Sequence, residues 1–195
     1  MGKEKYLSEV EALFSKSPVV SYSSIYRIIA SKKKVKQYAK RLVRYLISKG
    51  KIKRLTKGCY TAFDDASLAV FCFQPAYLGL QDALSFHNLW EQETVPVIVT
   101  TRKVRPGIRN ILGTNVLIRR IEKKYFFGLE YLNQGSAALP YSDIEKTFMD
   151  IVHFRERLDK DVLSAFKDRI DKKTLSAYLK RYPEKIRRRA LSYIT

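Results

Sequence analysis

The chain has 195 residues, and its 38 Lys plus Arg against 19 Asp plus Glu give a formal net charge of +19 and a pI of about 9.9. Its 46% hydrophobic and 12% aromatic residues are enough for a core, which excludes a disordered basic tail. No apolar run reaches the roughly 18 residues of a membrane span, the start of the chain lacks an apolar signal core, and two cysteines make no disulfide framework, so we expect a soluble, cytoplasmic protein with no membrane partner.

The first 62 residues carry a net charge of +13 and predict three helices. The first helix covers residues 5–15, because apolar residues recur on one face from Leu7 to Phe14. Pro18 follows it, residues 19–20 are expected to be extended, and a second helix begins at Ser21 or Ser23, both common N-cap residues, and ends near residue 30.

The third helix is predicted from Ser31 as N-cap to about Ser48, with Gly50 ending it. One face is an apolar stripe consisting of Val35, Ala39, Leu42, Val43 and Leu46. Lysines at positions 32–34 occupy the first turn, where the helix dipole disfavours cations. This cost is explained if that end of the helix meets phosphate.

Residues 51–55 and 59–62 are two β-prone runs around Thr56-Lys57-Gly58, a pattern typical of a hairpin with a bulge and Gly58 in the left-handed conformation. Three helices and a hairpin predict a winged helix-turn-helix domain over residues 1–63. Residues 31–58 hold 12 Lys or Arg and no acid, whereas a solvated helix face usually mixes both signs. A solubility surface or a thermophile bias is the alternative, but because the charge is clustered we interpret this segment as a surface for nucleic-acid phosphates.

A winged helix places its third helix in the major groove, so the side chains opposite the apolar stripe are expected to read bases. These candidates are Lys33, Gln37, Lys40, Arg41 and Arg44. Gln can pair bidentately with adenine, and Arg can do so with guanine. A second set is expected to hold phosphates and consists of Tyr22, Ser23, Ser24, Lys32, Lys36, Lys53, Arg54 and Lys57. For any one of these lysines, a solvated side chain is the alternative.

Residues 64–195 predict a second domain that mixes helices and strands. We expect strands at 68–73, 95–101, 115–121, 125–131 and 136–139, a helix at 78–90, and an irregular basic loop at 102–113. A helix over 143–153 is expected to begin at Ser142, with Glu145 completing a capping box. The predicted fold class is α+β, with a winged helix-turn-helix followed by a mixed α/β domain with a small sheet and a helical C-terminal tail.

The tail from residue 159 is predicted to be helical in two or three pieces, interrupted near Asp171 and at Pro183. Its charge is +7 over residues 151–195, whereas residues 63–150 carry −1. We interpret the C-terminal basic cluster as a solvated helix face, with contact to flanking DNA as the alternative; it consists of Lys185, Arg187, Arg188 and Arg189.

These segments together resemble the AbiEi-like antitoxin family, the regulator halves of type IV abortive-infection toxin–antitoxin pairs. The resemblance lies in Leu42-Val43, in residues 50–55 and 57–60, in YLGLQDALSFHNL at 77–89, in the strand at 95–101 and in DIEKTFMD at 143–150. It covers residues 5–155, and Gly79 departs from the Ser expected there.

The resemblance implies a double-stranded DNA-binding autorepressor of its own promoter. Because paired half-sites are common for such regulators, we expect inverted repeats in this DNA, and a homodimer on it stays open. It also implies that the C-terminal domain antagonises a nucleotidyltransferase-like toxin, without a stable complex. Two alternatives stay open: a solitary winged-helix regulator, and a nucleic-acid-binding protein without sequence preference or toxin partner.

A nuclease or transferase is the third class considered, and its candidate acids are Asp143, Glu145 and Asp150. Nuclease metal sites need carboxylates from several elements, whereas these lie near one helix. We interpret Glu145 as a capping residue and Asp150 as the ion-pair partner of Lys146.

The remaining candidate groups for catalysis are two histidines and two cysteines. We expect His87 to pack in the core, His153 to lie at a helix C-terminus where a cation is favourable, and Cys59 and Cys72 to be buried thiols on separate strands. No phosphate loop or metal-spaced Cys/His set occurs in the sequence. We therefore expect no enzyme, no cofactor and no metal.

Overall fold

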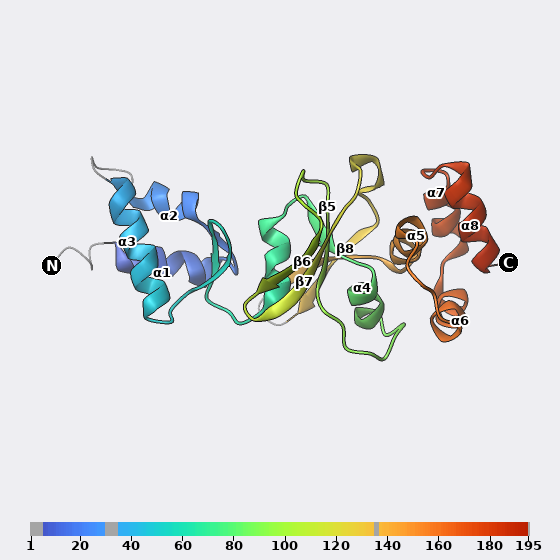
Figure 1. The fold of residues 1–195 in the computed structure, drawn as a ribbon, viewed down its shortest axis with the longest axis horizontal. Coiled ribbons are helices and arrows are strands. Elements are labelled where there is room, and N and C mark those ends of the chain that lie inside the picture. The colour runs from blue at the N-terminus through green and yellow to red at the C-terminus, as the bar shows by residue number, and fades with distance from the viewer. Residues whose placement is uncertain (1–5, 30–34, 135–136, 195) are drawn as a thin grey trace.

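A computed structural model describes residues 6–29, 35–134 and 137–194, and Figure 1 shows an elongated molecule. The N-terminal helices lie at one end, a large sheet lies in the middle, and the C-terminal helices lie at the other end (Figure 1). The α+β fold class predicted from the sequence is confirmed. Along the described residues, no helix combines the length and the apolar character that crossing a membrane requires.

The N-terminal unit has the element order of a winged helix: α1 Leu7–Lys16, β1 Val20–Ser21, α2 Tyr22–Ile29, α3 Val35–Ser48, β2 Lys53–Thr56 and β3 Cys59–Thr61. Its antiparallel sheet has the order β1-β3-β2. The Ser21 hydroxyl accepts the Ser24 N–H at 3.1 Å and so caps α2, as predicted. Gly50 ends α3 at φ +67°, and its N–H donates to the Ile47 carbonyl.

The wing is the predicted hairpin with a bulge. Thr56 is opposite Cys59, so the loop is Lys57-Gly58, one residue shorter than predicted, and the register shifts between Arg54 and Thr56. Gly58 has the expected positive φ of +84°.

The middle of the chain forms η1 Ala66–Cys72, β4 Ala76–Leu78, α4 Gln81–Phe86, β5 Val97–Thr100, β6 Gly107–Ile111, β7 Thr114–Arg120, η2 Lys123–Tyr125, β8 Leu129–Gln134 and β9 Ala137–Ser142. The strand order is β6-β7-β5-β4-β9-β8. The pairs β5–β7 and β4–β9 are parallel, and the other neighbours are antiparallel.

The two faces of this sheet carry separate cores, because successive side chains of a strand point to opposite faces. On β4, Ala76 and Leu78 belong to the core that contains η1, whereas Tyr77 belongs to the core beneath the C-terminal helices. On β5, Ile98 belongs to the core that contains η1, and Val99 belongs to the core beneath the C-terminal helices. Both sheet faces are therefore covered.

The C-terminal helices are α5 Ile144–Phe154, α6 Lys160–Arg169, α7 Lys172–Leu179 and α8 Glu184–Ile194. The breaks fall at Asp171 and Pro183, as predicted. Asp171 caps α7 by accepting the Thr174 N–H at 2.7 Å. The exposed residues Lys185, Arg187 and Arg188 lie on α8, where Arg188 pairs with Glu184.

Three predicted elements of the middle segment are wrong. Residues 68–73 are not a strand, because Asp65 accepts the Ser67 N–H at 2.8 Å and starts the helix η1. The predicted helix at 78–90 is only α4, because Leu78 is paired in β4. The predicted basic loop at 102–113 contains the edge strand β6.

The helix-start predictions also need two corrections. Asp143, and not Ser142, caps α5, since its carboxylate accepts the Lys146 N–H at 2.7 Å. At Gly79, a Cβ would lie 3.1 Å from Tyr77 Cε2 and 3.3 Å from Val99 Cγ2. The serine expected at this position would therefore require Tyr77 or Val99 to shift by a few tenths of an ångström.

The wing shares a core with the second domain. Leu55 of β2 is 4% exposed and belongs to the same apolar cluster as Leu68, Ile98 and Ile118. The remaining winged-helix core, from Val10 to Tyr60, is separate. The domain boundary predicted at residues 63–64 thus lies just after a hairpin that packs on both units.

Candidate nucleic-acid interface

The outer face of α3 is built by helical spacing. Ala39, Leu42, Val43 and Leu46 are buried against α1 and α2, each at most 4% exposed. The predicted base-reading side chains that the structure describes lie on the other face and are all exposed: Gln37, Lys40, Arg41 and Arg44. The apolar stripe is confirmed at these positions, and the structure brings the four polar side chains to one exposed surface.

The first turn of the expected third helix lies outside the described residues. This applies to Lys32 and Lys33, and to the side chains of Val35 and Lys36. Their predicted roles toward bases and phosphates stay predictions.

The wing keeps two of its three predicted phosphate ligands available. Lys57 is exposed at the tip, and Arg54 is exposed with its Nε–H donating to the Thr56 carbonyl at 3.3 Å. Lys53 instead pairs with the exposed Asp64 at 2.8 Å, so a carboxylate of the same chain competes with phosphate for it. That contact weakens the predicted phosphate role of Lys53.

The start of α2 differs from the prediction in its hydrogen bonds. The Tyr22 N–H donates to the Gly58 carbonyl at 2.8 Å, and the Ser24 N–H donates to Ser21. The Ser21 hydroxyl also bonds the hydroxyls of Ser23 (2.7 Å) and Ser24 (2.9 Å). The backbone N–H groups of Tyr22 and Ser24 are therefore engaged, so the phosphate contacts predicted for these two residues are left to their hydroxyls. The exposed Ser23 hydroxyl is the group best placed to reach a phosphate.

A second basic segment lies beside the wing; the sequence predicted its basic character but not this position. Strand β6 at the sheet edge contacts β2 of the wing. The segment that leads into β6 exposes Arg102, Lys103 and Arg105, and Arg109 lies above the Phe73 ring at 5.2 Å. Positive charge thus continues from the wing onto the second domain. The cluster of Arg and Lys between residues 102 and 109 was its signal in the sequence.

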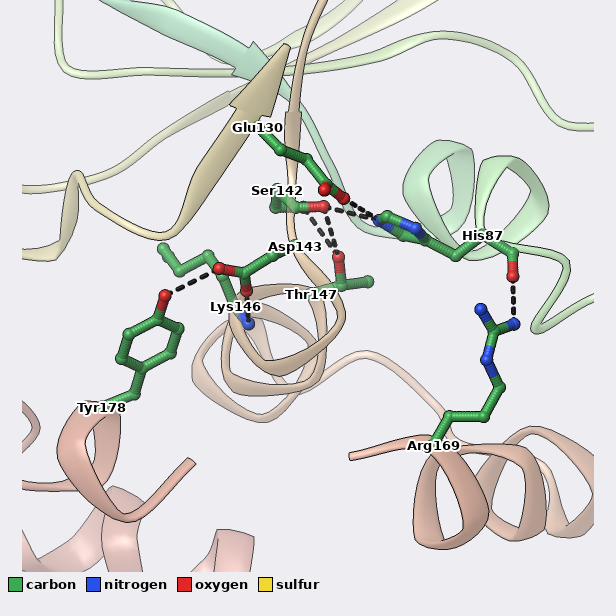
Figure 2. A network of polar contacts seen from close by, with 8 residues as sticks. All are labelled: His87, Glu130, Ser142, Asp143, Lys146, Thr147, Arg169 and Tyr178. Atoms are coloured by element: carbon green, nitrogen blue, oxygen red, sulfur yellow. Dashed lines mark hydrogen bonds and ion pairs between the residues drawn. The ribbon is translucent and has the colours of Figure 1, made fainter. Parts of the chain in front are cut away.

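The three candidate catalytic acids each hold the C-terminal helices in place. Asp143 accepts the Tyr178 hydroxyl at 2.7 Å as well as capping α5 (Figure 2). Glu145, 8% exposed, accepts the Asp171 N–H at 2.7 Å, so it joins α5 to α7 and is not the predicted capping-box partner. Asp150 pairs with Lys146, as predicted, inside the protein.

Both histidines pack against neighbouring side chains or backbone inside the second domain. His87 is buried as predicted, its Nε2–H donates to the Ser142 carbonyl at 2.7 Å, and Glu130 lies 3.4 Å away (Figure 2). His153 lies in the last turn of α5, but burial beside Tyr125 and Tyr182 lowers its pKa. The charged form that we expected at this helix end is therefore disfavoured.

These features define a winged-helix protein with a basic outer helix and an appended α/β domain. No family model matches the chain, and no curated protein matches it. Among solved structures, the crystal structure of the RV2827C protein from Mycobacterium tuberculosis is similar with a TM-score of 0.60 and 14% identity, covering 97% of this chain and 75% of that chain. At this identity the likeness concerns the fold alone.

Proposed function

We propose that this protein is a transcriptional repressor that binds double-stranded DNA sequence-specifically through α3 and the wing. The observation that carries the proposal is the division of α3 into a buried apolar face and an exposed face of Gln37, Lys40, Arg41 and Arg44. A helix that only supported the core would gain from acidic partners on its outer face. No acid occurs on this helix.

The spacing on α3 fits a major groove. Gln37, Arg41 and Arg44 are separated by four and three residues, so they form one stripe along the helix. The helix has 14 residues and is therefore about 21 Å long, enough to cross a groove roughly 12 Å wide. We assign Arg41 and Arg44 to guanine and Gln37 to adenine, with Lys40 beside them.

Phosphate contacts come from the wing and from the segment beside it in the proposal. Arg54 and Lys57 of the wing supply one set, and Lys103 and Arg105 beside the wing supply the other. These contacts fix the register of the protein on DNA without reading sequence. They give binding its salt dependence, because each neutralised phosphate releases counterions.

The finer part of the proposal is that the protein represses its own promoter as the antitoxin of a type IV toxin–antitoxin pair. The resemblance to AbiEi-like antitoxins supports this part, and the second domain is then the unit that counteracts a nucleotidyltransferase-like toxin. A solitary regulator without a toxin is the alternative.

DNA recognition is tested by a salt-titrated gel shift on the upstream DNA and on a scrambled duplex of equal length. A bidentate pair contributes about 1–3 kcal/mol, so Arg41→Ala plus Arg44→Ala is expected to weaken promoter binding by at least tenfold and scrambled binding much less. Lys172→Ala plus Lys173→Ala removes the same charge from α7 and is the matched control, expected to leave the promoter preference unchanged. Equal affinity of the wild type for both duplexes contradicts sequence-specific repression.

The antitoxin part is tested in cells. The gene next to this one is expressed alone and together with this protein, and growth is measured. Growth arrest by the neighbour and rescue by the wild type support the antitoxin. Rescue is expected to persist in the Arg41→Ala plus Arg44→Ala variant, because the second domain is intact. A neighbour that causes no arrest favours the solitary regulator.

A further inference from the structure

Two cysteines from different units of the protein meet under the wing. Cys59 lies on β3, opposite Ser21 of β1, and Cys72 is the last residue of η1, so the prediction that both lie on strands is wrong for Cys72. Cys72 is 8% exposed in the core that holds Leu55, and Cys59 packs against this core. Both are free thiols, they share this core, and each contributes to the pKa shift of the other.

Cys59 lines a cavity under the wing. The cavity has a volume of about 460 Å³ and lies between the winged helix and the second domain. Its lining includes Pro18, Cys59, Phe71 and Gln74, but not Cys72. A small reagent that enters this cavity therefore reaches Cys59 first, because Cys72 is buried in the adjoining core.

The surroundings give the two thiols different protonation. The hydrogen bond from Cys72, with smaller contributions from Thr56 and Arg102, lowers the pKa of Cys59 to about 6. The same hydrogen bond and burial raise the pKa of Cys72. Arg102 is held in place by a 2.7 Å hydrogen bond from its Nη1 to the Cys72 carbonyl. The surroundings thus favour the thiolate at Cys59 over the thiolate at Cys72, which is the arrangement of an attacking thiol with a second thiol poised to resolve it.

We propose that Cys59 and Cys72 form a hydroperoxide-reactive dithiol that closes to a disulfide between the wing and the second domain. In the first step the Cys59 thiolate attacks the terminal oxygen of a hydroperoxide, an S–O bond forms, the O–O bond breaks, and the alkoxide or hydroxide leaves and takes a proton from water. In the second step the Cys72 sulfur attacks the Cys59 sulfenic acid and loses its proton, the S–S bond forms, and the S–O bond breaks to release water. The two thiols lose two electrons, and the hydroperoxide gains them. This proposal does not depend on DNA binding.

The test uses the full chain, reduced and freed of reductant, and treated with one equivalent of hydrogen peroxide. Thiols are counted after denaturation, and peptides are mapped by mass spectrometry. We expect both thiols to be lost together and one cross-linked peptide pair containing residues 59 and 72, in a monomer. Free thiols after oxidation, or disulfides only between molecules, would overturn the proposal.

Two variants separate the roles of the cysteines. In Cys72→Ser, oxidation is expected to stop at the Cys59 sulfenic acid, which dimedone traps in one covalent adduct. In Cys59→Ser, Cys72 is expected to stay reduced under the same conditions. Wild-type protein unfolded in urea is the control for structural activation, and its Cys59 is expected to oxidise more slowly at pH 7 than in the folded chain. Equal rates in both states, or a dimedone adduct on Cys72, contradict the proposed arrangement even if a variant fails to fold.

Discussion

The pair Lys146–Asp150 provides the sharpest test of how the second domain is held together. Both side chains have no exposed surface, and the lysine ammonium contacts the carboxylate directly. Tyr77 donates to the other carboxylate oxygen at 2.5 Å, and the Lys146 ammonium donates to the Tyr182 hydroxyl at 3.2 Å. The Phe127 ring lies 5.3 Å from the ammonium. The network joins β4, α5 and the α7–α8 connection.

Asp150→Leu removes the negative charge and leaves Lys146 buried without its counter-ion. Breaking a buried pair in this way costs about 3–5 kcal/mol of the free energy of unfolding. For a chain of this size, 1 kcal/mol corresponds to about 2–4 °C in Tm, so we expect a drop of roughly 6–20 °C. Lys146→Met plus Asp150→Leu removes both charges and is expected to recover much of this loss.

The pH dependence of the stability of Asp150→Leu is a second measure of the charge left on Lys146. Burial already lowers the pKa of Lys146, and the Asp150 charge opposes this shift, so the variant lowers the pKa of Lys146 further. At a pH between the lowered pKa of Lys146 in the folded protein and its pKa of about 10.4 in the unfolded chain, Lys146 is protonated only in the unfolded state. The unfolded state then binds more protons, so the free energy of unfolding rises with pH. Thermal unfolding followed by circular dichroism from pH 6 to 10 is expected to show the Asp150→Leu defect shrinking as the pH rises. The reasoning is refuted if the single variant is as stable as the wild type, or if the double variant is no better than the single one.

Three further predictions concern stability. Gly128→Ala is expected to cost about 2–5 kcal/mol in denaturant unfolding, since Gly128 has φ +66° and a Cβ would lie 2.9 Å from Tyr178 and Lys146. Ser21→Ala is expected to cost about 1 kcal/mol through loss of the α2 cap. Burial raises the pKa of Asp82 to about 7. Between about pH 4 and 7 the native state therefore holds a proton that the unfolded state has lost, so the free energy of unfolding falls as the pH rises through this range. Asp82→Asn is expected to flatten that fall in a pH series of thermal unfolding.

Each of these has a control. Gly113→Ala, at φ +83° with nothing within 4 Å of the added Cβ, has the backbone strain without the clash and is expected to cost less than Gly128→Ala; equal costs would mean that crowding plays no part. Ser21→Asn keeps a cap acceptor, so a loss as large as that of Ser21→Ala argues against capping. For Asp82, the exposed Asp161→Asn is the comparison, and a pH profile unchanged by Asp82→Asn contradicts the assigned group.

The winged helix could be predicted from the sequence because its signals are local. Ser21 caps, Gly50 and Gly58 adopt positive φ, and helical periodicity marks the buried face of α3. In contrast, the run Leu68–Val70 is buried on every side, so its apolar character did not distinguish a strand from the helix η1. The strand β6 was missed because an exposed edge strand in a basic segment lacks the apolar alternation of a buried strand.

The candidate site shows the same limit. The four exposed residues of α3 followed from spacing on one helix. The pairing of Lys53 with Asp64, and the position of residues 102–109 beside the wing, depend on contacts between units, which spacing along the chain does not encode. The i,i+4 spacing did predict the partner of Lys146. It did not predict that Tyr77, 73 residues from Asp150 in the chain, completes that pair.

The side chain of Leu55 has a mechanical consequence. It lies on the wing yet is packed among residues of the large sheet, so the wing cannot tilt without either dragging the sheet or opening a void around this leucine. A force on the tip of the wing, where Lys57 is exposed, is therefore transmitted to the core of the second domain and is not absorbed by the loop alone. The hairpin and the second domain are therefore expected to move together, because Leu55 anchors the hairpin in that core.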